Sequence, residues 1–174
     1  MKVAIVNYSV GNVGSVSNAL ARIGITSLLV NYPSELRDFD AVVLPGVGRY
    51  DSAARILLNF RDILNELRGS LPVLGICLGF HLMLESSEEG GLPGLGWYKG
   101  KARRLRARRL PHIGWNLVEF VKSSPLTEGL PRRAYFYFMH SYAVTTIDRH
   151  LTSGITVYGE EFTSFASDDR NSTY

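Results

Sequence analysis

One stretch, residues 71–85, constrains the fold of this chain more than any other. Its sequence is LPVLGICLGFHLMLE. The apolar run from Leu71 to Ile76 predicts a buried strand, and apolar residues at helical spacing begin at Leu78. Cys77, the only cysteine of the chain, therefore falls on the turn from strand to helix, within the pattern Gly-x-Cys-x-Gly. This is the pattern of a nucleophile elbow, with sulfur in place of a serine oxygen.

The glycines and the helix give this turn its chemistry. A turn so sharp brings strand and helix together, and Gly75 and Gly79 avoid a clash because they lack a Cβ. A thiol at a helix N-terminus is expected to have a lowered pKa, because the positive end of the helix dipole favours the thiolate. The first-turn amide of Leu78 is placed to stabilise an oxyanion. A lone cysteine is commonly a small buried apolar residue, but the complete pattern favours a nucleophile at Cys77.

The first half of the chain alternates short apolar strands with helices. This order predicts an α/β fold with a doubly wound, mostly parallel sheet and helices on both faces. Strands are predicted at 2–6, 25–30 and 40–44, with one helix capped by Ser15 and another at 51–68. Ligands of such sheets bind beyond the carboxyl ends of the strands. The loop Pro45–Gly48 is therefore expected to share a pocket with Cys77.

The second half changes to a β-rich pattern. Aromatic and β-branched residues predict strands at 117–121, 135–139, 143–146, 155–158 and 162–165. No repeat or long linker separates the halves, so residues 1–174 are predicted to form a single domain. His112 is expected in a turn, and the polar end from Ser167 to Tyr174 is expected to be mobile. The basic run Lys99–Arg109 lacks the interleaved aromatics of a nucleic-acid stacking platform, which favours a solvated strand or a partner-facing surface.

Composition narrows the class of protein. A net charge of +3 does not by itself indicate nucleic-acid binding. The apolar runs are too short to span a bilayer, and the N-terminal one is too short for a signal-peptide core, so no membrane association is expected. The single cysteine excludes an internal disulfide and fits a reducing cytoplasm. Because no histidine pair has metal-ligand spacing with Cys77, we predict neither a metal site nor a cofactor.

A cysteine nucleophile needs a base that holds it as a thiolate and protonates the leaving group. The candidates are the four histidines His81, His112, His140 and His150. His81 lies one helical turn beyond Cys77. Spacing alone does not choose among the four.

Five motifs together make the chain recognisable. They are Gly11-Asn12-x-x-Ser15-Val16, LPGVG at 44–48, GICLG at 75–79, PHIGWN at 111–116 and YFMHSY at 137–142. In this combination the chain resembles the class I glutamine amidotransferases, and in particular the glutaminase subunits of imidazole glycerol phosphate synthase in histidine biosynthesis. The resemblance follows the family's order from residue 2 to about residue 165.

The resemblance implies a reaction and a partner. Cys77 is expected to attack the side-chain amide of glutamine, release ammonia and form a glutamyl thioester that water hydrolyses. The implied oxyanion hole consists of the amide of Leu78 and an amide of Gly46-Val47-Gly48, a loop that in the family is reoriented by the partner. The segment His140-Ser141-Tyr142 is expected to bind the backbone atoms of glutamine. Ammonia is expected to pass through a tunnel into a (βα)8-barrel cyclase subunit, which completes the imidazole ring.

The chain departs from the family pattern at two places. Many relatives carry glutamine at the position of His81, whose imidazole can still hydrogen-bond the substrate. The family's base and orienting acid come from a His-Pro-Glu run near the C-terminus, and no histidine here is followed by Pro-Glu. Three interpretations stay open: the segment follows Tyr174 in the full protein, the chain is an inactive scaffold, or His140 replaces the base. We favour the first, because the sequence follows the family up to its last residues.

Two other functions compete with the glutaminase. One is a cysteine-elbow hydrolase of another family, acting on peptides or small aldehydes. The other is an interaction subunit without catalytic activity. The PGVG and PHIGWN motifs favour the glutaminase, since such hydrolases need not contain them.

Overall fold

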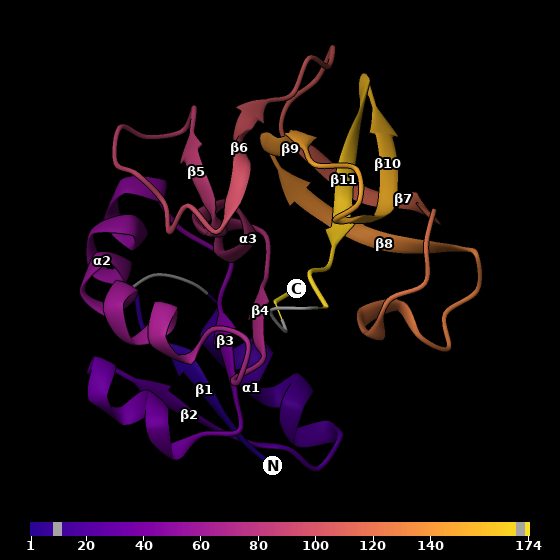
Figure 1. Cartoon of the computed structure of the whole chain (residues 1–174). Helices are drawn as coiled ribbons and strands as arrows, with labels where there is room; N and C mark the ends of the chain where they lie inside the picture. The colour runs from indigo at the N-terminus through magenta and orange to yellow at the C-terminus, as the bar shows by residue number, and fades with distance from the viewer. Residues whose placement is uncertain (9–11, 170–172) are drawn as a thin grey trace.

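Two β-sheets organise the chain, which a computed structural model describes over residues 1–8, 12–169 and 173–174 (Figure 1). The first half builds a four-stranded parallel sheet in the order β2-β1-β3-β4. The second half builds a seven-stranded sheet in the order β5-β6-β9-β11-β10-β7-β8. The predicted parallel sheet with a β-rich second half is therefore confirmed. Gly11, part of the first family motif, lies outside the described residues.

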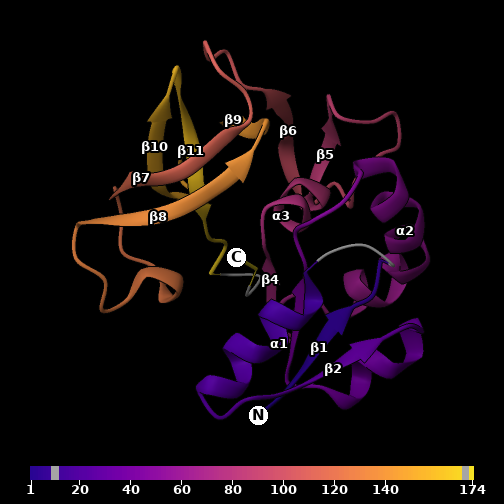
Figure 2. The same cartoon turned by 180° about the vertical axis from the view of Figure 1, so that it is seen from behind.

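The parallel sheet is covered by helices on both faces. Its strands are β1 (Lys2–Val6), β2 (Thr26–Val30), β3 (Ala41–Leu44) and β4 (Val73–Gly75). Helix α1 (Val13–Arg22) packs on the face that carries Val3, Ile5 and Val43 (Figure 2). Helix α2 (Tyr50–Leu67) and the 3-10 helix η1 (Pro33–Asp38) pack on the opposite face, in the main core. Successive strand side chains point to opposite faces, so both faces of the sheet are packed, and helices on both faces make the arrangement doubly wound.

Helix α1 begins two residues before Ser15, which the sequence predicted as its cap. The cap is Asn12, whose side-chain Oδ1 accepts a hydrogen bond from the N–H of Ser15 at 3.2 Å. Asparagine and serine are about equally good N-caps, so local preference did not separate them. Within the described ranges, no helix combines the length and the apolar character needed to cross a membrane.

The second sheet is mostly antiparallel. Its strands are β5 (Leu84–Ser87), β6 (Tyr98–Arg104), β7 (His112–Phe120), β8 (Arg133–His140), β9 (Tyr142–Ile147), β10 (Thr152–Tyr158) and β11 (Glu160–Ala166). Among the strand pairs described in this second sheet, only β5–β6 is parallel. The short 3-10 helix η2 (Pro125–Thr127) lies in the connection from β7 to β8. The first part of the basic run Lys99–Arg109 belongs to β6. This strand lies next to β5, above helix α3 in Figure 1.

One expectation for this half is wrong. His112 does not lie in a turn but begins β7, which pairs with β8 without interruption from His112 opposite His140 to Glu119 opposite Arg133. Proline and glycine in PHIGWN suggested a turn. Instead, the backbone from His112 onward is extended because it pairs with the distant strand β8.

The C-terminal end is anchored, so the expectation of a mobile end is wrong for its described residues. Ser167, Asp168 and Thr173 are buried. The N–H of Tyr174 donates to the carbonyl of Val73 at 2.9 Å, and the carbonyl of Tyr174 accepts the N–H of Gly75 at 2.7 Å. Because Thr173 pairs with Val73 in a parallel bridge, the chain runs beside β4 in the same direction (Figure 1).

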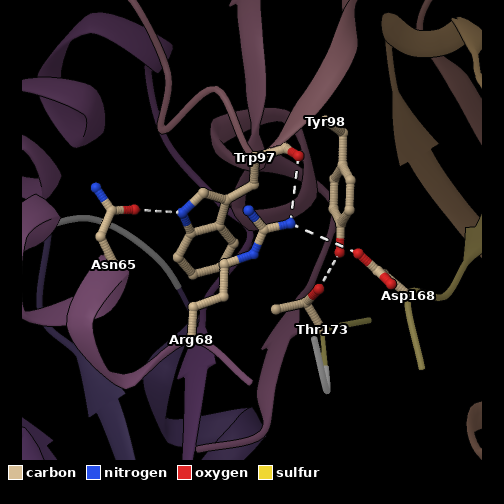
Figure 3. A network of polar contacts seen from close by, with 6 residues as sticks. All are labelled: Asn65, Arg68, Trp97, Tyr98, Asp168 and Thr173. Carbon is tan, nitrogen blue, oxygen red and sulfur yellow. Dashed lines mark hydrogen bonds and ion pairs between the residues drawn. The ribbon is translucent and has the colours of Figure 1, made fainter. Parts of the chain in front are cut away.

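A polar network holds this end against α2 and β6 (Figure 3). The guanidinium of Arg68 lies over the rings of Trp97 and Tyr98, at 5.1 and 5.7 Å from their centroids. It also reaches Asp168 at 3.5 Å, while the hydroxyls of Tyr98 and Thr173 are hydrogen-bonded to each other. Three segments far apart in the sequence are therefore joined at one buried point.

Candidate active site

Cys77 occupies a strained turn between β4 and the short helix α3 (Leu78–Met83). Its φ is +50°, and it is the one non-glycine residue with positive φ in the described part of the chain. A left-handed backbone at a residue with a side chain stores strain and is typical of a nucleophile elbow. A Cβ on Gly75 would lie 2.8 Å from the amide nitrogen of Phe80, and one on Gly79 would lie 2.0 Å from the carbonyl of Leu44. The predicted need for both glycines is confirmed.

The thiol is not activated by its position. Burial raises the pKa of Cys77 and outweighs the hydrogen bond from the backbone N–H of Leu78, which lowers it; the Glu89 carboxylate raises it further. The expectation of a lowered pKa is therefore wrong. Helix α3 has only six residues, so its dipole contributes little against the loss of solvation. Cys77 still has solvent contact, which leaves it accessible to a substrate.

The candidate nucleophile, oxyanion-hole and glutamine-binding residues surround one pocket of about 230 Å³, whereas the candidate bases His112 and His150 are not among the residues that line it. Those that surround it are Cys77, Leu78 and His81 of the elbow, Gly46, Val47 and Gly48 after β3, and His140, Ser141 and Tyr142 between β8 and β9. The first two groups follow β3 and β4 at their carboxyl ends, as the rule for doubly wound sheets predicts. The loops are closely apposed, since a Cβ on Gly46 would lie 2.1 Å from the carbonyl of Ile76.

A larger cavity of about 450 Å³ adjoins this pocket. It extends from Cys77 between the two sheets, and its lining includes Gly75 of β4, Asn12 and Ser15 near the start of α1, and Phe162 of β11. Gly75, the last residue of β4, therefore lies at the wall of this cavity.

Glu89 is a pocket residue that the sequence did not reveal. It belongs to the loop after β5 and lines the pocket together with Cys77. Burial raises the pKa of its carboxyl, while a hydrogen bond with the backbone of Tyr50 lowers it and the nearby Asp51 raises it. The only signal in the sequence is a glutamate pair in a glycine-rich loop, which does not show which glutamate faces the pocket.

The start of α2 fixes this loop. The side-chain Oδ1 of Asp51 accepts hydrogen bonds from the N–H groups of Gly91 at 2.9 Å and Leu92 at 3.0 Å. A Cβ on Gly90 would lie 2.1 Å from the same oxygen. Close packing on α2 thus places Glu89 at the pocket.

His140 has both ring nitrogens engaged. Its Nδ1 lies 2.8 Å from the carbonyl of Tyr142, and its Nε2 lies 2.9 Å from Nδ1 of His112. A carbonyl only accepts, so Nδ1 of His140 carries the proton and Nε2 accepts from His112. This geometry disfavours His140 as a replacement for the missing base.

The other histidines are also poor bases. Burial, followed by the neighbouring His140, lowers the pKa of His81 to about 4. An imidazole with so low a pKa has little tendency to take a proton from a thiol of raised pKa. His150 lies on the surface, where its Nδ1 pairs with Asp148 at 2.7 Å, and is not among the residues that line the pocket.

Known proteins are similar in sequence to this chain over most of its length. The family described as Glutamine amidotransferase class-I matches residues 4–167. The protein named imidazole glycerol phosphate synthase subunit HisH 2 of Methanococcus maripaludis is 41% identical over 174 residues, which cover 96% of this chain and 86% of that protein. The subunit HisH of Pyrobaculum aerophilum is 46% identical over 145 residues, which cover 83% of this chain and 72% of that protein.

Solved structures share the fold at low identity. PurLQS from Thermotoga maritima superposes with a TM-score of 0.74 at 18% identity, covering 99% of this chain and 84% of that chain. A crystal structure of a glutamine amidotransferase gives a TM-score of 0.72 at 19% identity, covering 97% and 93% of the two chains. With the family match over nearly the whole sequence and an elbow cysteine at the centre of the pocket, this chain belongs to the class-I glutamine amidotransferase family.

Proposed function

We propose that this chain is the glutaminase subunit of an imidazole glycerol phosphate synthase. It hydrolyses glutamine to glutamate and ammonia, and it supplies the ammonia to a cyclase partner in histidine biosynthesis. The observation that carries the proposal is the convergence of the elbow, the PGVG loop and the His140–Tyr142 turn on one pocket. The names of the relatives at 41% and 46% identity support the choice of synthase. The cytoplasm suits this function because the thiol must stay reduced.

The chemistry proceeds through a thioester. The sulfur of Cys77 attacks the side-chain amide carbon of glutamine, and the oxyanion is stabilised by the N–H of Leu78 and an amide of Gly46-Val47-Gly48. The thiol proton passes through a base to the amide nitrogen, which leaves as ammonia. Water then attacks the thioester, releases glutamate and restores the thiol.

Glutamine carries an ammonium and a carboxylate that the pocket has to hold. The carboxylate of Glu89 suits the ammonium, because Glu89 is the one acidic side chain among the described residues that line the pocket. The backbone of the His140–Tyr142 turn suits the carboxylate end. His81, neutral because burial lowers its pKa to about 4, hydrogen-bonds the substrate without adding charge.

The raised pKa of Cys77 means that a base is required. Neither histidine among the described residues that line the pocket suits this role, because the pKa of His81 is low and both ring nitrogens of His140 are engaged.

The outward faces of β7 and β8 supply a surface for the partner, which we call the aromatic patch. Its members are Ile113, Trp115, Tyr135, Tyr137 and Met139, all exposed. Trp115 is 71% exposed, and its ring lies 5.9 Å from that of Tyr137 on the neighbouring strand. A contiguous group of exposed aromatic side chains and methionine is typical of a protein interface.

The aromatic patch is continuous with the active site. Met139 belongs to the patch and also lines the pocket around Cys77. A cyclase bound to the patch therefore covers the rim of the pocket, where ammonia would otherwise escape into water. We expect Trp115→Glu to weaken cyclase binding at least about tenfold, whereas Tyr32→Ser, at a residue 69% exposed on the other half, leaves it unchanged. If Trp115→Glu and Tyr32→Ser bind the cyclase equally well, the aromatic patch is not the surface that the cyclase contacts.

The function is tested on the protein assembled with its cyclase. Cys77→Ala is expected to abolish glutamine-dependent synthesis and to leave ammonia-dependent synthesis intact, because only the first needs the nucleophile. A glutamine-like electrophile is expected to add once, at Cys77. Unchanged partner-dependent behaviour of Cys77→Ala would indicate a scaffold, and labelling only by peptide or aldehyde electrophiles would indicate another hydrolase.

A further inference from the structure

A chain of hydrogen bonds leads from the second sheet to the pocket. The side-chain Nδ2 of Asn116 lies 3.0 Å from the carbonyl of Val157 and 3.2 Å from Nε2 of His112. Its Oδ1 accepts the N–H of Leu117 at 2.8 Å, which fixes the orientation of the amide. His112 Nδ1 then lies 2.9 Å from Nε2 of His140.

Only one arrangement of protons satisfies this chain. Asn116 donates to Nε2 of His112, so neutral His112 carries its proton on Nδ1. His112 donates in turn to Nε2 of His140, and His140 donates from Nδ1 to the carbonyl of Tyr142 at 2.8 Å. The donors from Asn116 through His112 to His140 therefore follow one another toward the turn that lines the pocket.

The ring of His112 is held in place by its neighbours. It stacks between Phe138, with centroids 4.9 Å apart, and Tyr158, with centroids 3.9 Å apart, each with an interplanar angle of 17°. His112 is only 3% exposed. Stacking on both faces restricts rotation of the imidazole, so the direction of its N–H is set before any ligand binds.

We propose that His112 is a positioning residue for glutamine hydrolysis, which acts through His140 to fix the turn from His140 to Tyr142. The inference rests on the proposed function, because that turn is the one assigned to glutamine. The bond to the carbonyl of Tyr142 orients the turn's backbone in the free enzyme. A pre-set turn binds glutamine without first losing conformational freedom.

The arrangement holds only while both imidazoles are neutral. A proton on Nε2 of His140 would set two N–H groups against each other across 2.9 Å. Burial lowers the pKa of both His112 and His140, which keeps the pair neutral near pH 7. The other titratable groups around the pair are His81 of α3, Tyr142 of β9, Tyr158 of β10, and Cys77 and Glu89 across the pocket.

Two substitutions separate the donor from the stacking. His112→Phe keeps an aromatic ring between Phe138 and Tyr158 but removes the N–H, whereas His112→Asn removes the ring but keeps a donor near the position of Nδ1. In the protein assembled with its cyclase, we expect His112→Phe to raise the KM for glutamine about tenfold, with ammonia-dependent synthesis unchanged. His112→Asn should restore most of the affinity. An unchanged KM for His112→Phe, or equal KM values for the two variants, would overturn the proposal.

A spectroscopic test does not depend on activity. Nitrogen-15 shifts of the imidazoles are expected to show His140 as the Nδ1–H tautomer in the unsubstituted protein and as a mixture in His112→Phe. An Nε2–H tautomer at His140 in the unsubstituted protein would refute the chain of donors. If His112→Phe does not assemble, Asn116→Leu is used, and it should shift the His112 tautomer and raise the KM. If the proposed function itself is wrong, the unsubstituted protein will already lack glutamine-dependent synthesis, which distinguishes that outcome from failure of the His112 proposal.

Discussion

Adjacent glutamates in the loop after β5 have different surroundings. Glu88 lies on the surface, where its carboxylate accepts the N–H of Arg104 at 3.0 Å and pairs with Lys101 at 3.4 Å. Glu89 lines the pocket and is held by the start of α2. Both side chains are exposed, but only Glu89 lines the pocket, so the pair offers a matched test of a charge at the pocket against a charge away from it.

Removing the charge at Glu89 should weaken glutamine binding. Glu89→Gln keeps the size of the side chain but loses the charge that attracts the ammonium, so the KM for glutamine should rise about 10- to 100-fold. Ammonia-dependent synthesis should not change. The matched variant Glu88→Gln should leave the KM within about twofold, because an exposed ion pair contributes little. Steady-state kinetics that show the same rise for both variants would contradict the assignment.

His81 couples the stability of the fold to pH. Its pKa falls from 6.5 to about 4 on folding, mainly by burial. Between these values the unfolded chain binds a proton that the folded chain does not, so the free energy of unfolding rises with pH across this window. The contribution is about 3 kcal/mol, fully present above pH 6.5 and lost toward pH 4.

The substitution His81→Gln should remove this part of the pH dependence. Urea unfolding of the unsubstituted protein and the variant at several values between pH 4 and 7 gives the difference in slope. His150→Gln serves as the control, because His150 is exposed and paired only with Asp148. Parallel curves for the unsubstituted protein and His81→Gln would show that His81 is not the titrating group.

At the scale of the elements, the elbow depends on the close approach of α3 and β3. Gly79→Ala would place a methyl group 2.0 Å from the carbonyl of Leu44, a backbone atom that cannot turn away. We expect a loss of about 2–3 kcal/mol in the free energy of unfolding. Gly14→Ala in α1 meets nothing within 4 Å and should stabilise the protein by about 0.5–1 kcal/mol. Denaturant unfolding measures both, and a neutral Gly79→Ala would mean that the two elements do not pack this closely.

Elements that depend on local sequence were predictable, whereas elements placed by long-range contacts were not. The elbow rests on residues within one strand–turn–helix unit, and the local pattern around Cys77 revealed it. The start of β7 at His112 depends on its register with β8, more than twenty positions away, and a local turn signal was misleading. Glu89 was missed for the same reason, since the loop after β5 is placed by contacts with α2. The pKa of Cys77 depends on desolvation of the thiol and on the charge of Glu89 in a distant loop, which the helix position alone does not reveal.

At the scale of the whole molecule, the C-terminal end connects the two sheets. Asp168 follows β11 of the second sheet, whereas Tyr174 is hydrogen-bonded to β4 of the first. Arg68 at the end of α2 contacts Asp168 and both aromatic residues at the start of β6 (Figure 3). Because Tyr174 accepts the N–H of Gly75, this network supports the strand that leads into the elbow.

Arg68→Ala should therefore loosen a strand that the arginine does not touch. The substitution removes a cation from beside a carboxylate that is only 6% exposed, and it removes the stacking on Trp97 and Tyr98, so the free energy of unfolding should fall by roughly 3 kcal/mol. Native-state hydrogen exchange at the amide of Gly75 should accelerate at least about tenfold. Arg37→Ala is the control, because the Arg37–Glu66 pair is about half exposed and contributes at most about 1 kcal/mol. Unchanged protection of Gly75 in Arg68→Ala would mean that the bond from Tyr174 holds without the network, and that the first sheet supports the elbow alone.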